Sequence, residues 1–397
     1  MHPRGTAGGR RRVGAPRPAG HRRRARRGAG RSPAGRPTAG RPAAGRPAAA
    51  GTAGPRAHEC HDRHGHRPHR HRETTVTAAR NQQTGGQPAP APAPEPAPAQ
   101  EAQPVRPLPL VSVVVPARNA AATLGRQLEA LAGQDYTGPW EVVVVDDGSQ
   151  DGTGEVAATY RPRLPRLHVV RTRGTGGGGV NRARNTGCRH SAGDVLVFCD
   201  ADDVVAPGWL TAMEEALRRS PAVGGALERV SLNDSVALAA RPPKPTACLA
   251  DTFGFLPYPL GANCGARREV WALLGGFDER YLYGSDDVEF FWRAQLAGRE
   301  LAFVPDAVVH YQLRSTVRQM VRQAFRYGRS HPMLFRTFAA HGMPRSSLPG
   351  LAREWGWLLC HGLHLVGRTD RRAAWLSRAA LRSGRLVGSV RHRVLYL

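Results

Sequence analysis

The sequence lacks the features that mark membrane-spanning, secreted and disulfide-stabilised proteins. No run of about 18 apolar residues occurs, so we expect no transmembrane helix. The N-terminus is basic without an apolar stretch, so we expect no secretory signal. The six cysteines include no CxxC pair and no zinc-finger spacing. Reduced thiols in a cytoplasmic protein fit this pattern better than a disulfide framework.

Acidic residues are scarce: 31 stand against 57 lysines and arginines, for a formal net charge of +26. The charge is unevenly placed, because residues 1–105 hold 20 arginines and 5 acids, and residues 314–397 hold 16 arginines and 2 acids. The 208 residues between them hold 21 basic and 24 acidic residues. The overall charge suggests a nucleic-acid-binding protein as one alternative. The near-neutral middle and the absence of a recognised motif predict no specific nucleic-acid partner.

Three regions follow from this distribution. Residues 1–106 are rich in Arg, Gly, Pro, Ala and His and nearly devoid of large apolar residues, which predicts a disordered segment. Residues 107–313 carry the alternating apolar patterns of a folded catalytic domain. Residues 314–397 form a basic region with helical periodicity.

The middle region alternates strand and helix patterns. Valine-rich strands are expected at residues 111–115, 140–145, 167–170 and 195–198, with helical patterns between them. This alternation predicts an α/β fold built on a parallel sheet. Residues 224–240 are predicted to form two short strands around a turn at Asn233-Asp234, and a helix is expected to start at Asp286.

Three of these strands end in polar loops. The loops are Pro116 to Asn119, Asp146-Asp147-Gly148-Ser149, and Asp200-Ala201-Asp202-Asp203. Ligands of parallel α/β sheets bind beyond the carboxyl ends of the strands, so the three loops are expected to converge on one crevice. Three carboxylates at the end of a buried strand need a positive partner. A divalent metal that carries a diphosphate meets this need, which points to a nucleotide-activated substrate.

These motifs together resemble family 2 glycosyltransferases. The resemblance rests on VSVVVPARN (111–119), VVDDGSQDGT (144–153), ARNTG (183–187), DADD (200–203), GGFDER (275–280) and DDVE (286–289), and it covers roughly residues 108–313. It implies a GT-A fold with a Rossmann-like mixed sheet, followed here by a C-terminal helical extension. It also implies a nucleotide-sugar donor, Mg²⁺ or Mn²⁺ as cofactor, and inversion at the anomeric carbon.

The resemblance implies roles for individual residues. The nucleoside and donor would be held by Pro116, Arg118, Asn119, Asp146, Asp147, Arg184, Asn185 and Asp200. Asp202 would bind the metal, with Asp200 beside it and His310 as a further ligand. Asp287 would be the catalytic base, next to Asp286 where the family usually has Glu. Arg118 replaces the family's usual Tyr, which favours a diphosphate contact over base stacking.

The resemblance also limits the type of reaction and the acceptor that we expect. The Gln-x-x-Arg-Trp signature of processive synthases is missing, since the chain reads Phe291-Trp292-Arg293, so we expect the addition of a single sugar. The expected acceptor is a glycan or a lipid-linked molecule of cell-surface polysaccharide or glycolipid synthesis. A nucleotidyltransferase of similar fold is the alternative enzyme. It would need a Gly-rich basic loop after the first strand, where Pro116-Ala117-Arg118-Asn119 stands instead.

The last region has the pattern of amphipathic helices. An apolar row formed by Val317, Met320, Val321, Ala324 and Phe325 is flanked by arginines at four-residue spacing from Arg314 to Arg326. Such helices could lie on an anionic membrane surface, which would place the protein peripherally on the inner membrane face. Alternatively, they pack on the catalytic domain and expose solvated arginines. The two alternatives are compatible.

Overall fold

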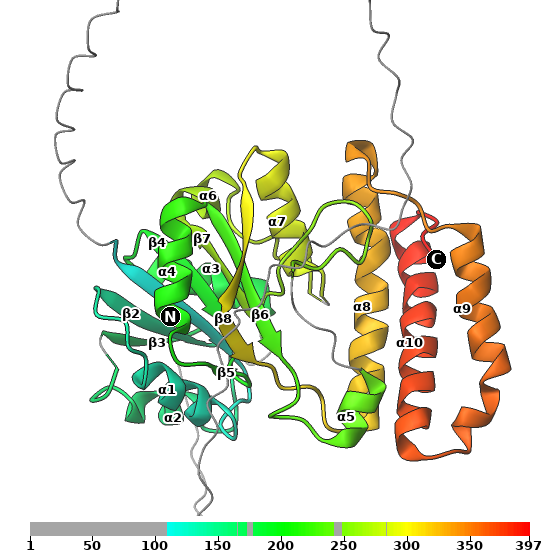
Figure 1. The fold of residues 1–397 in the computed structure, drawn as a ribbon, viewed down its shortest axis with the longest axis horizontal. Coiled ribbons are helices and arrows are strands. Elements are labelled where there is room, and N and C mark those ends of the chain that lie inside the picture. Colours follow the sequence, from blue (N-terminus) through cyan, green and yellow to red (C-terminus); the bar gives the residue numbers. More distant parts are fainter. Residues whose placement is uncertain (1–108, 165, 173–177, 242–247, 283) are drawn as a thin grey trace, which may run out of the picture. The chain divides into compact units, whose positions relative to one another are not determined.

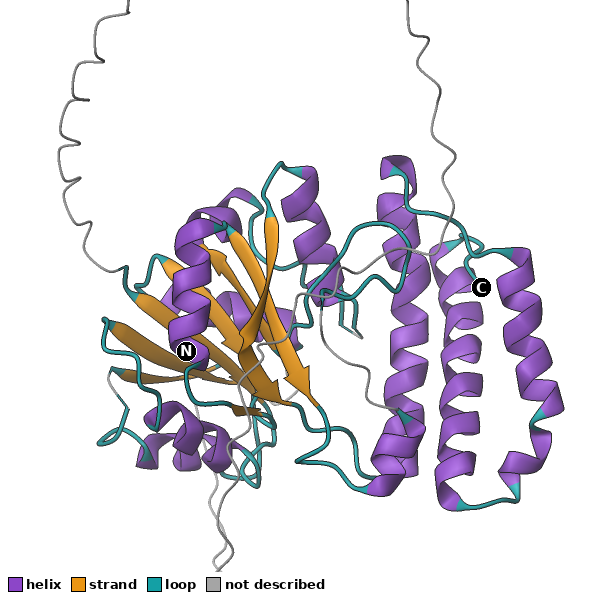
Figure 2. Ribbon diagram, viewed as in Figure 1, coloured by secondary structure: helices purple, strands orange, loops and turns teal. Residues whose placement is uncertain are grey.

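The computed structural model of the protein describes residues 109–397, apart from 165, 173–177, 242–247 and 283. The predicted disordered segment, residues 1–106, lies outside the described residues. The described part holds an eight-stranded sheet covered by helices, with long helices at its C-terminal end (Figures 1 and 2). The predicted α/β class, with a mixed sheet and a C-terminal helical extension, is confirmed.

The sheet has a parallel part and a mixed part. Its strand order is β3-β2-β1-β4-β7-β6-β8-β5, and the first four strands in this order are mutually parallel. β7 is antiparallel to both of its neighbours, β4 and β6. The strands are β1 (Val111–Ala117), β2 (Trp140–Asp146), β3 (Leu167–Arg171), β4 (Val195–Cys199), β5 (Val204–Val205), β6 (Ala222–Glu228), β7 (Asn263–Arg267) and β8 (Leu301–His310). The carboxyl ends of β1, β2 and β4 therefore share one edge, as the sequence predicts.

Helices cover both faces of the sheet. One face packs against α1 (Leu124–Ala132), α2 (Thr153–Thr159) and α4 (Trp209–Arg219). The other packs against α3 (Val180–His190), α6 (Arg268–Leu273) and α7 (Asp286–Leu296). The pleat explains this division, since Val113 and Val115 of β1 join the first layer and Val114 joins the second. Each fully buried side chain of this size stabilises the fold by roughly 1.5–3 kcal/mol.

The prediction of two strands around Asn233-Asp234 is wrong in its second half. β6 forms as expected, but residues 235–240 are helix α5 (Ser235–Ala240). Asp234 is the N-cap of this helix, and its carboxylate accepts a hydrogen bond of 2.8 Å from the backbone N–H of Ala237. An Asp before a run of helix-forming alanines and leucine is typical of a helix N-cap, and this preference outweighs the tendency of Asn233-Asp234 to form a turn between strands.

The C-terminal region consists of three long helices that lie side by side (Figure 2). They are α8 (Val317–Phe338), α9 (Leu348–Cys360) and α10 (Thr369–His392), with short 3₁₀ turns η1 (Ala339–His341) and η2 (Gly362–Leu365). Glycines allow α8 and α10 to approach closely, because a Cβ at Gly328 or Gly384 would collide with the backbone of the facing helix. α8 also packs on the sheet domain, where Phe338 meets Trp292 of α7 at a ring-centroid distance of 5.2 Å. No helix among the described residues combines the length and apolar character of a membrane span.

Candidate active site

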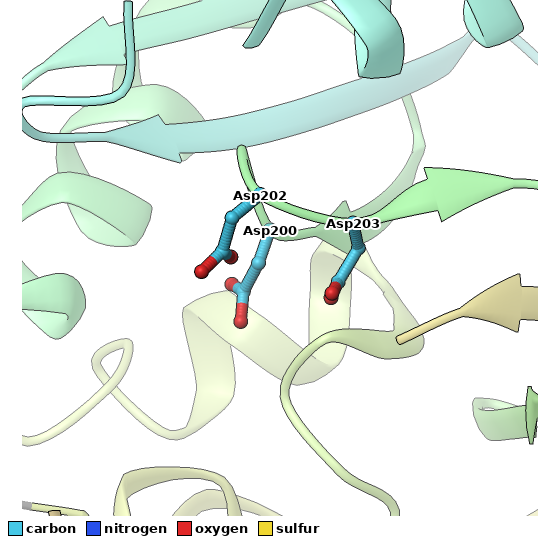
Figure 3. A group of neighbouring side chains, drawn as sticks. All are labelled: Asp200, Asp202 and Asp203. Atoms are coloured by element: carbon cyan, nitrogen blue, oxygen red, sulfur yellow. The ribbon is translucent and has the colours of Figure 1, made fainter. Parts of the chain in front are cut away.

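The acid cluster lies at the end of β4, where the chain passes into β5. One carboxylate oxygen from each of Asp200, Asp202 and Asp203 lies within 4.8 Å of the others. Figure 3 shows the three side chains directed to the same side of this segment. Asp200 and Asp202 are partly exposed, whereas Asp203 is fully buried. Hard carboxylate oxygens at this spacing suit Mg²⁺ or Mn²⁺, which accept few protein ligands and complete their shell with substrate oxygens.

Asp203 has a supporting position in this cluster. Its Oδ1 accepts a 2.7 Å hydrogen bond from the backbone N–H of Gln312, which fixes the segment after β8. Its Oδ2 is buried without a hydrogen-bond partner among the described residues. Burial, together with the charges of Asp200 and Asp202, raises the pKa of Asp203 well above its ordinary value. A cation at the cluster would relieve this unfavourable burial, so the donor set fits a divalent ion.

Arg184 connects the acid cluster with the predicted catalytic acids. Its Nη1 donates to Asp286 Oδ2 at 2.5 Å, and its Nη2 lies 3.4 Å from Asp200 Oδ1 and 3.1 Å from the Gly261 carbonyl oxygen. The side chain is only 2% exposed. A buried guanidinium between two carboxylates holds them at a fixed separation. Arg184 therefore fixes the position of these two carboxylates, and its predicted contact with the donor stays a prediction.

Asp287 is held by backbone donors at the start of α7. Its Oδ2 accepts from the N–H of Gly261 and its Oδ1 from the N–H of Val288, both at 2.8 Å. Burial raises the pKa of Asp287 to about 6, and the neighbouring charge of Asp286 contributes. A carboxylate with a raised pKa is a better proton acceptor near neutral pH than an ordinary one.

Asp202 already has a cationic partner in this structure. Arg314, in the segment that follows β8, places its Nη1 2.8 Å from Asp202 Oδ2. Burial raises the pKa of the adjacent Asp200 to about 6, against the lowering effect of Arg184. A metal at Asp202 would therefore compete with Arg314, whose side chain is more than two-fifths exposed.

His310 is occupied by other partners. Its Nδ1 lies 2.9 Å from Glu228 Oε2 and 3.0 Å from Ser231 Oγ. The group of three aspartates does not include it. Its predicted role as a metal ligand stays a prediction, and only its Nε2 has no partner among the described residues.

The loops after β1 and β2 are tied to each other. The Asn119 backbone, at φ 48°, donates to Ser149 Oγ, and its Oδ1 accepts from the Gln150 N–H. Asp147 is buried and accepts from the N–H groups of Gly178 and Gly179 and from Thr172 Oγ1. Asp146 accepts from the Ser149 N–H. These predicted nucleoside contacts lie at the expected edge, with Arg118 exposed beside the half-buried Pro116.

Asn185 is hydrogen bonded to the turn before α7. Its Nδ2 donates to the Phe277 carbonyl oxygen and to Glu279, and its Oδ1 accepts from the Phe277 N–H and the Trp271 indole. A side-chain amide has two donor hydrogens and two acceptor lone pairs, and all four are used. Asn185 therefore fixes the turn at residues 276–279, and its predicted place near the donor stays a prediction.

Sequence reasoning missed two contributors to the site. The backbone of Gly261, just before β7, donates to Asp287 and accepts from Arg184. Nothing in the local sequence marks Gly261, because its partners lie far along the chain. In the sequence, Arg314 is only the first of a row of arginines, whereas in the folded chain it is the ion-pair partner of Asp202.

Comparison with known families agrees with this geometry. The model of "Glycosyl transferase family 2" matches residues 112–272, and that of "Glycosyl transferase family group 2" matches residues 247–381. The chain belongs to glycosyltransferase family 2. Together the two matches include the acid cluster, the Asp286-Asp287 pair and most of α8 to α10. The GT-A type that the sequence motifs implied is thus confirmed for this glycosyltransferase.

Individual relatives are similar at low identity. Glycosyltransferase AglE of Haloferax volcanii is 28% identical over 298 residues, which are 70% of this glycosyltransferase and 96% of AglE. An N-acetylglucosaminyltransferase of Rhizobium meliloti is 29% identical over 63% of this chain, which spans 62% of that protein. Among solved structures, a Pyrobaculum calidifontis mannosyltransferase in complex with GDP-Man and Mn²⁺ has a TM-score of 0.48 and 23% identity, over 71% of this chain and 88% of that one.

Proposed function

We propose that this glycosyltransferase transfers one sugar from a nucleotide-diphospho-sugar to an acceptor hydroxyl, with inversion at the anomeric carbon. The observation that carries the proposal is the Arg184 clamp, which joins Asp200 of the acid cluster to Asp286, the neighbour of Asp287. A donor-side acid group and an acceptor-side base are thereby held in one rigid unit. Inverting transfer needs both of these functions in a single site.

The residues have separate tasks in this reaction. Asp202 and Asp200 would hold Mg²⁺ or Mn²⁺, and the bound ion would supply Lewis-acid stabilisation of the leaving diphosphate. Asp287 removes the proton of the acceptor hydroxyl as its oxygen forms a bond to the anomeric carbon. The bond from that carbon to the diphosphate oxygen breaks, and the nucleoside diphosphate leaves. Because attack and departure occur on opposite faces, the configuration inverts.

The proposal is tested by donor binding. Ligands that bind only the folded state raise its melting temperature, by RT ln(1 + [L]/Kd) in free energy, or about 2.7 kcal/mol at 100 times Kd. With Mn²⁺ present, we expect one of UDP-, GDP- and dTDP-sugars to raise the melting temperature of the full chain. The increase should disappear with EDTA. An absence of any increase across the panel would contradict the proposal.

We further propose that α9 and η2 rest on an anionic membrane surface. Leu359, Leu363 and Val366 are between 81% and 86% exposed, and they form an apolar ridge that no described residue covers. Exposed Arg353 and Arg368 stand near this ridge in sequence. Apolar side chains flanked by arginines suit an interfacial position on negatively charged lipids. This placement agrees with a glycan or lipid-linked acceptor at the inner membrane face.

The Leu359→Ser, Leu363→Ser double variant is expected to lose vesicle binding. Co-sedimentation with phosphatidylglycerol-containing vesicles should fall about tenfold or more, because each buried leucine contributes roughly 1.5–3 kcal/mol. Leu273→Ser, a change at a leucine of α6 that is 55% exposed, should bind like the wild type. Equal sedimentation of all three proteins, or equal binding to neutral phosphatidylcholine, would contradict this role of α9 and η2.

A further inference from the structure

A cavity lies between the short helix α5 and the long helices α8 and α10. Figure 1 shows α5 beside α8, and α10 beside α8. The cavity measures about 250 Å³. Its apolar wall comes from all three helices and the segment before α8, namely Ala237, Leu313, Met320, Ala324, Ala374 and Leu381. None of these residues belongs to the catalytic machinery described above.

Three arginines line this cavity, together with the polar side chains of Gln323, Tyr327 and Ser377. Arg241, at the end of α5, is partly buried, hydrogen bonds to Tyr327 and has no ion pair to an acid among the described residues. Arg378 of α10 stacks on the Trp357 ring at 4.0 Å and likewise has no acidic partner in that part of the chain. Arg314 is the third, and Asp202 is its only acidic partner there.

A fourth guanidinium adds to the local excess of positive charge. Arg229 lies over the Tyr311 ring at 5.9 Å, and its Nε is buried without a hydrogen-bond partner in the described part of the chain. Burial and the nearby charge of Arg241 lower its pKa. Among the described residues, only Arg314 of these four arginines has a carboxylate partner. Guanidiniums without such a partner repel each other in a partly buried region, and an anion between them removes this cost. Arginine forks match phosphate oxygens well.

The cavity is connected to both halves of the active site. On the donor side, Arg314 forms the ion pair with Asp202. On the acceptor side, the Tyr327 ring packs against Gly284, and Ser330 of the same helix hydrogen bonds to Ser285 at 2.8 Å. Gly284 and Ser285 directly precede Asp286 and Asp287. Tyr327, which lines the cavity, therefore contacts the segment that leads directly into the proposed base.

We propose that this cavity binds the acceptor, and that the acceptor is an amphiphile with a phosphate group next to a hydrocarbon chain. This inference rests on the proposed function and specifies its acceptor. The arginines bind the phosphate, the apolar wall takes the first part of the chain, and the hydroxyl to be glycosylated faces Asp287. The remaining chain would extend toward the lipid surface proposed for α9 and η2.

Octyl phosphate is a suitable probe, with octanol and inorganic phosphate as its two halves. Calorimetry on the full chain should show binding of octyl phosphate at least tenfold tighter than either half. Arg241→Gln should weaken octyl phosphate binding by about ten- to 100-fold, the range expected for lost hydrogen bonds to a charged group. Arg378→Gln, an exposed change that leaves the fold intact, should also weaken it. Arg299→Gln, on an exposed turn after α7, should bind as the wild type does.

Two results would overturn the inference. One is equal octyl phosphate affinity in the wild type, Arg241→Gln and Arg378→Gln. The other is equal affinity for octanol and octyl phosphate. The melting temperature of the chain with a nucleotide sugar and Mn²⁺ distinguishes failure of this inference from failure of the proposed function. If a donor stabilises the chain and octyl phosphate does not bind, only the acceptor inference fails, whereas absence of donor stabilisation contradicts the proposed function itself.

Discussion

Asp287→Asn is expected to lower kcat by about 10²- to 10⁴-fold, the usual contribution of a general base. The amide keeps the size of the side chain and can still accept the hydrogen bond from Gly261, but it cannot take a proton from the acceptor hydroxyl. Donor binding should be unchanged, because Asp202 and Asp200 are untouched. The measurement is release of nucleoside diphosphate under saturating donor and acceptor.

The matched control for this variant is Asp306→Asn. Asp306 is an exposed aspartate of β8, so its amide variant should keep full activity. Retention of more than one-tenth of kcat by Asp287→Asn would contradict its role as base. A parallel loss in both variants would point to a general effect of charge.

The carboxylate of Asp287 also sets the acidic limb of the pH profile of kcat/KM. Burial and Asp286 raise the pKa of Asp287 to about 6, so the basic form is present above this pH and is lost below it. The wild-type kcat/KM is therefore expected to fall about tenfold per pH unit below pH ~6. A limb near pH 4, the region of an ordinary carboxylate, would show that Asp287 is not the titrating base.

Asp202→Asn is expected to abolish Mn²⁺ binding and lower turnover at least ~100-fold. A metal Lewis acid contributes several kcal/mol to the transition state, and each 1.36 kcal/mol corresponds to a tenfold change in rate. The neutral amide keeps the shape of the cluster but removes the charge that holds the cation. Mn²⁺ binding can be followed directly by electron paramagnetic resonance of the free ion.

Arg314→Gln is the control that isolates the metal from the ion pair. Both Asp202→Asn and Arg314→Gln break the 2.8 Å contact between these side chains, but only the first removes a metal ligand. Arg314→Gln should bind Mn²⁺ at least as tightly as the wild type, since a competing cation is gone. Loss of Mn²⁺ binding in Arg314→Gln, or its retention in Asp202→Asn, would contradict the assignment.

The local sequence pattern was sufficient to predict the parallel half of the sheet. The valine runs of β1, β2 and β4 are buried on both faces, and such runs predict central parallel strands directly. β7 could not be predicted in this way. Its sequence Asn-Cys-Gly-Ala-Arg has no β-branched residue, and it is a strand because β4 and β6 pair with it on both sides.

The residues of the candidate site also fall into two groups, those that the sequence could predict and those that only the fold reveals. Asp200, Asp202, Asp286 and Asp287 stand in short motifs, so the sequence could predict them as site residues. Arg184 lies 102 residues from Asp286 along the chain, and only the folded sheet shows that it connects the two acid pairs. The family resemblance implies a place near the donor for both Arg184 and Asn185, and on α3 the two adjacent side chains take different partners. Arg184 meets the acids and Asn185 meets the turn at 276–279.

The central claim is that one metal-assisted site, formed by Asp202 and Asp287, uses a nucleotide sugar. Its most direct test is release of nucleoside diphosphate by the full chain, with natural lipid extracts as the source of hydroxyl acceptors and UDP-, GDP- and dTDP-sugars as donors. The account predicts release from at least one donor with Mn²⁺, loss of release with EDTA, and loss in both Asp202→Asn and Asp287→Asn. Release that persists in EDTA and in both variants would contradict it.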